Sequence, residues 1–180
     1  MSLVEFPVEF PRLETERLIL QELTSDDSEA IFQNFSDEDV TRYFMAEPFT
    51  RLEQAQSLVE AFIDEFKQGK SIMWVLVLKG SDVCIGTCNF MVQSSSCVEM
   101  GYDLAKAHWG KGLMSEATSA IIDYGFSCLG CGKIEADTMS HNARSINLLQ
   151  RLGFRLDDVR KDGHYFSLLK ESWSDGGVSP

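Results

Sequence analysis

The sequence predicts one α/β domain (of the α+β kind), in which a mixed sheet of about seven strands is flanked by helices. Three observations lead to this prediction. The 180 residues, 1–180, suit a single domain with a sizeable core. Seven segments have the apolar period of a strand, and the segments between them have the period of a helix. Strands joined by tight turns in mid-chain and through helices near the end predict a mixed sheet.

The N-terminal part predicts one strand followed by helices. RLILQEL, residues 17–23, alternates as a strand does. Residues 24–35 begin with Ser and Asp side chains that suit a helix N-cap, and a second short helix covers 37–44. Thr50 is predicted to cap a longer helix, with Glu53 completing a capping box and one apolar face running for about five turns.

Strands dominate the middle of the chain, and helices alternate with strands after it. The runs MWVLVL, VCIGTCNFMV and CVEMGYDL, separated by the turns KGSD and QSSS, predict an antiparallel meander. A helix then begins at Leu113, and KIEADTM predicts another strand. A short helix capped by Asn142 and a hairpin around KDGH follow, and residues 174–180 predict a frayed tail.

Composition limits the classes of partner. Asp and Glu number 28 against 16 Lys and Arg, a formal charge of −12, which argues against nucleic acid. The charge either favours a cationic or amine-bearing partner or simply keeps the protein soluble. No apolar run reaches the roughly 18 to 20 residues of a membrane span, and the N-terminus lacks the pattern of a secretory signal. We therefore expect a cytoplasmic monomer or homodimer that binds neither nucleic acid nor a membrane.

The five cysteines predict free thiols and no metal site. Cys84 and Cys88 lie on one predicted strand, roughly 13 Å apart, which is too far for them to share a zinc ion. Cys128 and Cys131 follow a predicted helix, at the end where the helix dipole disfavours a thiolate.

The stretch HWGKGLMSEA, residues 108–117, has the features of an anion site. It places two glycines between a strand that ends at Leu104 and a helix that begins at Leu113. Unpaired N–H groups at a helix start attract anions, and glycines let a ligand approach the main chain. A plain tight turn explains the same glycines equally well. The stretch lacks the fingerprints of dinucleotide and nucleotide-triphosphate loops, which disfavours NAD and ATP.

Three motifs together resemble the GNAT superfamily of acyl-CoA-dependent N-acetyltransferases: VEMGYDL, WGKGLMSEA and HNARSINLLQRLGF. ETERLIL is similar to the opening of the RimJ/RimL branch, the ribosomal-protein N-terminal acetyltransferases and their relatives. The resemblance spans roughly residues 13–173. It implies a mostly antiparallel GNAT-type sheet whose central strand pair is splayed.

The resemblance implies acetyl-CoA as co-substrate, with no metal. In the family, main-chain amides of the glycine loop hold the pyrophosphate of coenzyme A. Here the loop residues are Trp109, Gly110, Lys111, Gly112, Leu113 and Met114. Ala107 stands where the family signature has Gln or Arg, but the contacts are mainly with the backbone, so we expect binding to persist. Lys111 either adds charge to the phosphates or is an ordinary solvated lysine.

The family also inserts the pantetheine arm between the splayed strands. The resemblance places it along residues 101–104, which include Tyr102 and Leu104, much as a peptide adds to a sheet edge. An amide of that strand would polarise the thioester carbonyl and stabilise the oxyanion. Asn142 either bonds the pantetheine or caps its helix, and the two roles are compatible.

The reaction needs a base and an acid, because the acceptor amine is protonated near neutral pH and the departing sulfur needs a proton. Glu99, Asp103, Glu135 and Asp137 are the candidate bases. We prefer Glu99 because its strand would also supply the oxyanion donor; a surface carboxylate is the alternative interpretation. Ser145, which matches a serine common in the RimJ/RimL branch, would donate to the sulfur or else be a helix-surface serine.

Two departures from the family pattern leave the acceptor open. The usual Arg after the first-strand motif is Gln21, and no obvious peptide-binding signature appears. Separately, many members place a tyrosine acid where this chain has Leu149, which excludes a tyrosine acid at that position. The expected activity is transfer of acetyl from acetyl-CoA to a primary amine by direct attack in a ternary complex. A protein N-terminus and a small molecule such as a polyamine or aminoglycoside are the alternative acceptors, and a noncatalytic CoA-binding module is the alternative to an enzyme. Residues 26–70 should roof the site and select the acceptor.

Overall fold

The computed structural model describes residues 4–44 and 47–173, which form one eight-stranded sheet with helices on both faces. The strands lie in the order β1-β2-β3-β4-β5-β6-β8-β7. Their bounds are β1 Leu13–Glu14, β2 Leu18–Glu22, β3 Ser71–Leu78, β4 Cys84–Ser94, β5 Cys97–Leu104, β6 Lys133–Thr138, β7 Arg155–Val159 and β8 His164–Leu169. All seven predicted strands are present, and the short β1 is an addition. The predicted tail lies outside the described residues.

The helices are α1 Ser28–Phe35, α2 Glu38–Thr41, α3 Leu52–Lys67, α4 Leu113–Ser127 and α5 Ala143–Arg151, with short 3-10 turns at Ser25–Asp27, Lys106–His108 and Lys170–Ser172. The predicted cap of α3 was wrong. The helix begins after Arg51, and the side-chain Oε1 of Gln54, rather than Glu53, accepts from the N–H groups of Thr50 and Arg51. The cap of α5 is confirmed, because Oδ1 of Asn142 accepts from the Ser145 N–H at 3.2 Å.

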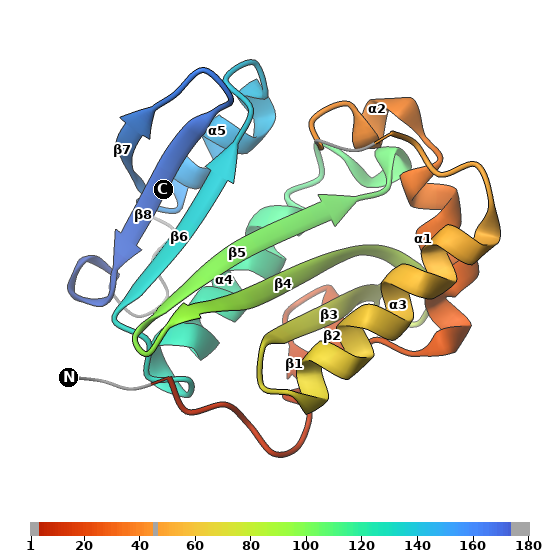
Figure 1. Ribbon diagram of the computed structural model, residues 1–180, viewed down its shortest axis with the longest axis horizontal. Helices are drawn as coiled ribbons and strands as arrows, with labels where there is room; N and C mark the ends of the chain where they lie inside the picture. The colour runs from red at the N-terminus through yellow and green to blue at the C-terminus, as the bar shows by residue number, and fades with distance from the viewer. Residues whose placement is uncertain (1–3, 45–46, 174–180) are drawn as a thin grey trace.

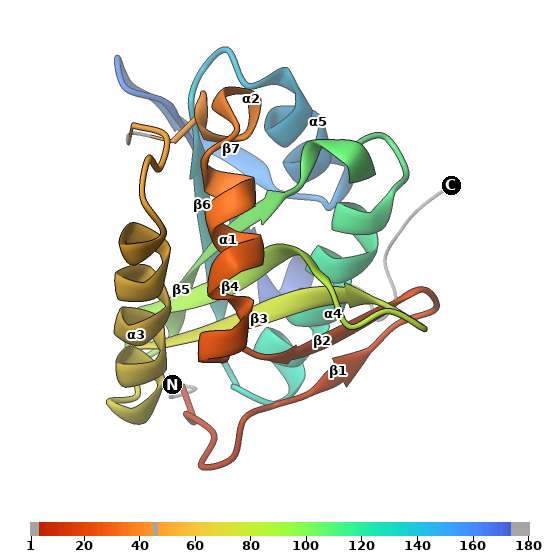
Figure 2. The same cartoon turned by 90° about the vertical axis from the view of Figure 1, so that its right-hand side faces the viewer.

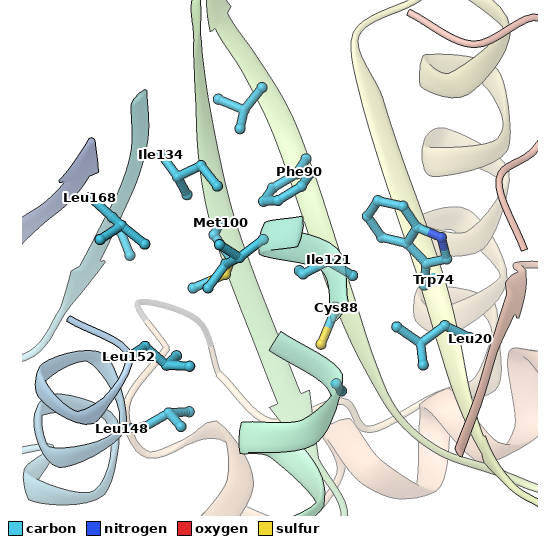
Figure 3. Close-up of a cluster of buried hydrophobic side chains, with 14 of the residues drawn as sticks. Leu20, Trp74, Cys88, Phe90, Met100, Ile121, Ile134, Leu148, Leu152 and Leu168 are labelled. Atoms are coloured by element: carbon cyan, nitrogen blue, oxygen red, sulfur yellow. The ribbon is translucent and has the colours of Figure 1, made fainter. Parts of the chain in front are cut away.

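Alternating residues of the strands build a separate apolar layer on each face of the sheet. On one face α1 and α3 pack on Val75 and its neighbours, while α4 and α5 cover the other face (Figure 2). The second layer contains the larger side chains, among them fully buried Trp74, Phe90 and Ile121 (Figure 3). Burial of an aromatic or branched side chain contributes about 1.5 to 3 kcal/mol, so these two layers hold the sheet in place between its helices.

The expected splaying of the central strands is confirmed. Every neighbouring pair is antiparallel except β5 and β6, which pair in parallel only over Cys97–Lys133, Val98–Ile134 and Glu99–Glu135. Beyond that point β5 stays paired with β4 as far as Leu104, and β6 stays paired with β8 as far as Thr138. Figure 1 shows the two strands diverging from there. We call the point of divergence, at Glu99 and Glu135, the fork.

Candidate functional site

The glycine loop, residues 109–114, presents free N–H groups at the start of α4. Gly110 and Gly112 have φ of 73° and 74°, a left-handed conformation that favours glycine. Gly112 is the N-cap of the 15-residue helix α4 and makes no side-chain cap. Among the described residues, no main-chain N–H from Gly110 to Ser115 finds an acceptor. These unpaired donors and the positive end of the helix suit an anion.

Bonds to distant parts of the chain hold the loop in this shape. Glu116 accepts from the main-chain N–H and Nε of Arg17, both at 2.7 Å, and from the hydroxyl of Thr15. Burial opposes ionisation of Glu116, but these hydrogen bonds outweigh it and lower its pKa. Arg17 also donates from Nη1 to the carbonyl of Lys111 at 2.8 Å. Thr15 and Arg17, between β1 and β2, therefore hold the loop through a long-range contact that the sequence did not predict.

The side chains of the loop residues are mostly occupied elsewhere. Leu113 and the preceding Leu104 are buried in the core. Trp109 donates from Nε1 to the Leu104 carbonyl at 2.7 Å. Lys111 donates from Nζ to the carbonyl of Ala107 at 2.8 Å, and Met114 contacts the thiol of Cys88. Among the described residues, the main-chain N–H groups after Trp109 are thus the part of the loop without a hydrogen-bond partner.

A carboxylate pair stands at the fork. Glu99 and Glu135 are register partners on β5 and β6, and Glu99 accepts from Nε2 of Gln93 at 2.7 Å. Half-burial, followed by the negative charges of Asp137 and Glu135, raises the pKa of Glu99. By strand alternation, Glu99 points to the face that bears α1 and α3. A carboxylate whose pKa is raised in this way is a stronger base once it is ionised.

The opposite face of β5 carries a pair of hydroxyl groups. Tyr102 Oη and Ser145 Oγ lie 2.7 Å apart and join β5 to the first turn of α5. Ser145 is 9% exposed, so it is a buried serine rather than a helix-surface one. Burial is the largest cause of the raised pKa of Tyr102. The sequence offered Tyr102 only as a binding residue, because its approach to Ser145 depends on how α5 packs. Leu149 is fully buried in the core.

Asp103, another candidate base, is enclosed in the packing between β5 and α1. It is 7% exposed and accepts from the amide of Asn34 and the hydroxyl of Thr87. Burial raises its pKa to about 6 although both hydrogen bonds oppose the shift. Both of its oxygens accept hydrogen bonds inside this packing, so Asp103 is less accessible to an acceptor amine than the half-buried Glu99.

Residues 4–44 and 47–173 contain neither a group of side chains that could hold a metal ion nor a helix that could span a membrane. No group of three or more His, Cys, Asp or Glu side chains has the geometry to hold a metal ion within those ranges. No helix among the same residues is long and apolar enough to span a membrane.

The chain is similar to a family of acetyltransferases and to several of its members. The family model of the acetyltransferase (GNAT) domain matches residues 17–155. The chain is 38% identical over 174 residues to the uncharacterized N-acetyltransferase p20 of Bacillus licheniformis, covering 90% of this chain and 98% of that protein. It is 37% identical over 118 residues to the ribosomal protein uS5 alanine N-acetyltransferase of Escherichia coli (strain K12), covering 63% of this chain and 59% of that protein.

A solved structure shares the fold. RimJ of Mycobacterium smegmatis, in complex with CoA-disulfide, superposes on this chain with a TM-score of 0.79 at 16% identity, covering 89% of this chain and 87% of that one. At this identity the likeness concerns the fold alone.

Proposed function

The chain belongs to the GNAT family of acetyltransferases, and from this premise we propose that it acetylates the α-amine of a protein N-terminus, as the RimJ/RimL branch does. It is an N-acetyltransferase of that family, and acetyl-CoA is the proposed donor. The activity in the names of its relatives favours an enzyme over a noncatalytic CoA-binding module. We further propose the class of acceptor, a direct attack in a ternary complex and the residues that transfer protons.

The observation that carries the proposal is the divergence of β5 and β6 beside the unpaired N–H groups of the glycine loop. The loop amides would bind the pyrophosphate of the donor. The edge of β5 from Gly101 to Leu104, which β6 does not pair with, would pair with the pantetheine as an added strand pairs with a sheet edge, except at the Leu104 carbonyl, which accepts from Trp109. This arrangement would bring the thioester to the fork, where a main-chain amide of β5 would stabilise the oxyanion.

The two faces of β5 suggest how protons move. Glu99, on the α1 and α3 face, would take a proton from the ammonium group of the acceptor, directly or through water. The free amine then attacks the thioester carbon in the ternary complex and forms a tetrahedral intermediate. As the C–S bond breaks, Ser145, backed by the hydroxyl of Tyr102, would donate a proton to the sulfur on the opposite face and regain one from solvent. The nitrogen, which still carries an extra proton after the attack, would release that proton to solvent. The products are the N-acetylated acceptor and CoA with a free thiol.

Two observations support a cationic acceptor. The chain has a formal charge of −12, and Glu99, Glu135 and Asp137 are close enough to influence one another. The uS5 alanine N-acetyltransferase acts on a protein with an N-terminal alanine, which supports a protein acceptor for this chain. The group of three carboxylates keeps a polyamine as the second candidate, because several ammonium groups could be matched at once.

Acetylation of matched acceptors tests the proposal. Peptides that begin with alanine, the same peptides with a blocked N-terminus, polyamines and aminoglycosides would each be mixed with acetyl-CoA while the free thiol is followed. We expect turnover of the free peptides and none of the blocked ones, even when they contain lysine. Turnover of polyamines or aminoglycosides alone would refute the proposed acceptor class while leaving the transferase activity intact.

A further inference from the structure

Four cationic side chains lie around the glycine loop of this acidic protein, and three of them are already used. Arg17 is bound by Glu116 and the carbonyl of Lys111. Lys106 pairs with Asp39, and Lys111 donates to Ala107. Arg144, in the first turn of α5, is different, because among the described residues it donates no hydrogen bond and forms no ion pair.

Arg144 is nevertheless held in place. Its guanidinium carbon lies 4.4 Å from the centroid of the Trp109 ring, and Trp109 is anchored to the Leu104 carbonyl. Asn142 caps the same turn of α5. Stacking on an aromatic face fixes the plane of a guanidinium, and the five N–H donors at its edges remain available for hydrogen bonds. A positioned arginine with unused donors is suited to a phosphate group.

We propose that Arg144 binds a phosphate of coenzyme A and forms, from α5, a side-chain clamp opposite the main-chain amides of the glycine loop. This inference rests on the proposed use of acetyl-CoA at the loop. Trp109 follows β5, whereas Arg144 follows β6, so the contact bridges the two chain segments that diverge from the fork. Donor binding would thereby hold α5, and with it Ser145, against β5.

Binding measurements without acceptor test the proposal. CoA, dephospho-CoA, which lacks the 3′-phosphate, and pantetheine, which lacks every phosphate, would be titrated against the wild type and Arg144→Gln, by calorimetry or, for weak ligands, by NMR. We expect Arg144→Gln to weaken CoA binding roughly 10- to 100-fold, the range of one charge-assisted hydrogen-bond pair. The affinity for pantetheine should change less than about twofold, because pantetheine has no phosphate that Arg144 could bind.

The dephospho-CoA measurement identifies the phosphate. A loss that persists with dephospho-CoA assigns Arg144 to the pyrophosphate, and a loss that disappears assigns it to the 3′-phosphate. Arg144→Lys keeps the charge without the planar guanidinium, and its affinity for CoA should lie between those of the wild type and Arg144→Gln. Arg151→Gln is the matched control, because Arg151 lies on the same helix and, among residues 4–44 and 47–173, its side chain donates only to the carbonyl of Asn147. It should bind all three ligands as the wild type does.

Two results would overturn the proposal: an unchanged affinity of Arg144→Gln for CoA, or an equal loss of affinity for CoA and pantetheine. The second result would make Arg144 only a structural partner of Trp109. Failure of the proposed acceptor is distinguishable, because wild-type protein that binds CoA but acetylates no peptide leaves this test intact.

Discussion

The hydroxyl groups of Tyr102 and Ser145 form a 2.7 Å hydrogen bond between β5 and α5. Leu149 stands where many family members have a tyrosine acid, and it is buried in the core. Tyr102 brings a phenol to the serine from another element. The pair therefore offers a proton donor whose hydroxyl is supported by a second one.

Removal of these hydroxyls should affect turnover more than donor binding. We expect Ser145→Ala to lower kcat by roughly 100-fold, the usual contribution of a positioned acid, with little change in KM for acetyl-CoA. Tyr102→Phe should cost less, and the double variant should be less active than Ser145→Ala by only a small factor, since the two hydroxyls act together. Steady-state kinetics measures this coupling. Fully additive losses would show that Tyr102 does not act through Ser145.

The pH profile tests Glu99 as the base. Because the pKa of Glu99 is raised, the fall of kcat/KM on acidification should begin above the ordinary glutamate range, as the base becomes protonated. Glu99→Gln should lower kcat/KM by roughly 100-fold and abolish that acidic limb. Asp137→Asn removes a charge that raises the pKa of Glu99, so the limb should move to lower pH. An unmoved limb in both variants would exclude Glu99.

Asp103 should make the folded protein less stable as pH rises. Its pKa is about 6 in the folded state against an ordinary value of 3.8, so the folded state binds the extra proton in that interval. Stability is full below about pH 4 and falls as pH rises through 6, by roughly 3 kcal/mol for two pKa units. Asp103→Asn should flatten this dependence and gain stability relative to the wild type at pH 8. Urea unfolding at pH 4.5 and 8 measures it, and a parallel dependence in both proteins would contradict it.

Gly110 and Gly80 provide a matched pair for the glycine loop. Both have a positive φ, 73° and 85°, and a Cβ added at either would meet nothing within 4 Å. Alanine at either position should cost about 1 to 2 kcal/mol of stability through backbone strain. Only Gly110→Ala should also weaken CoA binding, because only its strain displaces the loop amides. Thermal unfolding and calorimetry separate the two effects, and equal CoA affinity of both variants would argue against the loop as the phosphate site.

Local patterns predicted the elements well because their causes are local. Period-two alternation found all seven longer strands, and Asn142 was correctly predicted as a cap, since both depend on neighbours within a few residues. The cap of α3 was predicted wrongly because Gln and Glu side chains can both complete a capping box. Gln54 does so here only because the helix begins after Arg51 and not after Thr50. β1 was missed because two residues carry no period.

The strand and helix segments, the glycine loop and, through its motifs, the family could be predicted from the amino-acid sequence. Which side chains meet depends on the packing of the folded chain. The bond between Tyr102 and Ser145, the brace of Arg17 on Glu116 and the stacking of Arg144 on Trp109 each join residues far apart in the chain. Such pairs depend on how helices pack across the sheet, and packing complementarity leaves no periodic signal in a single sequence.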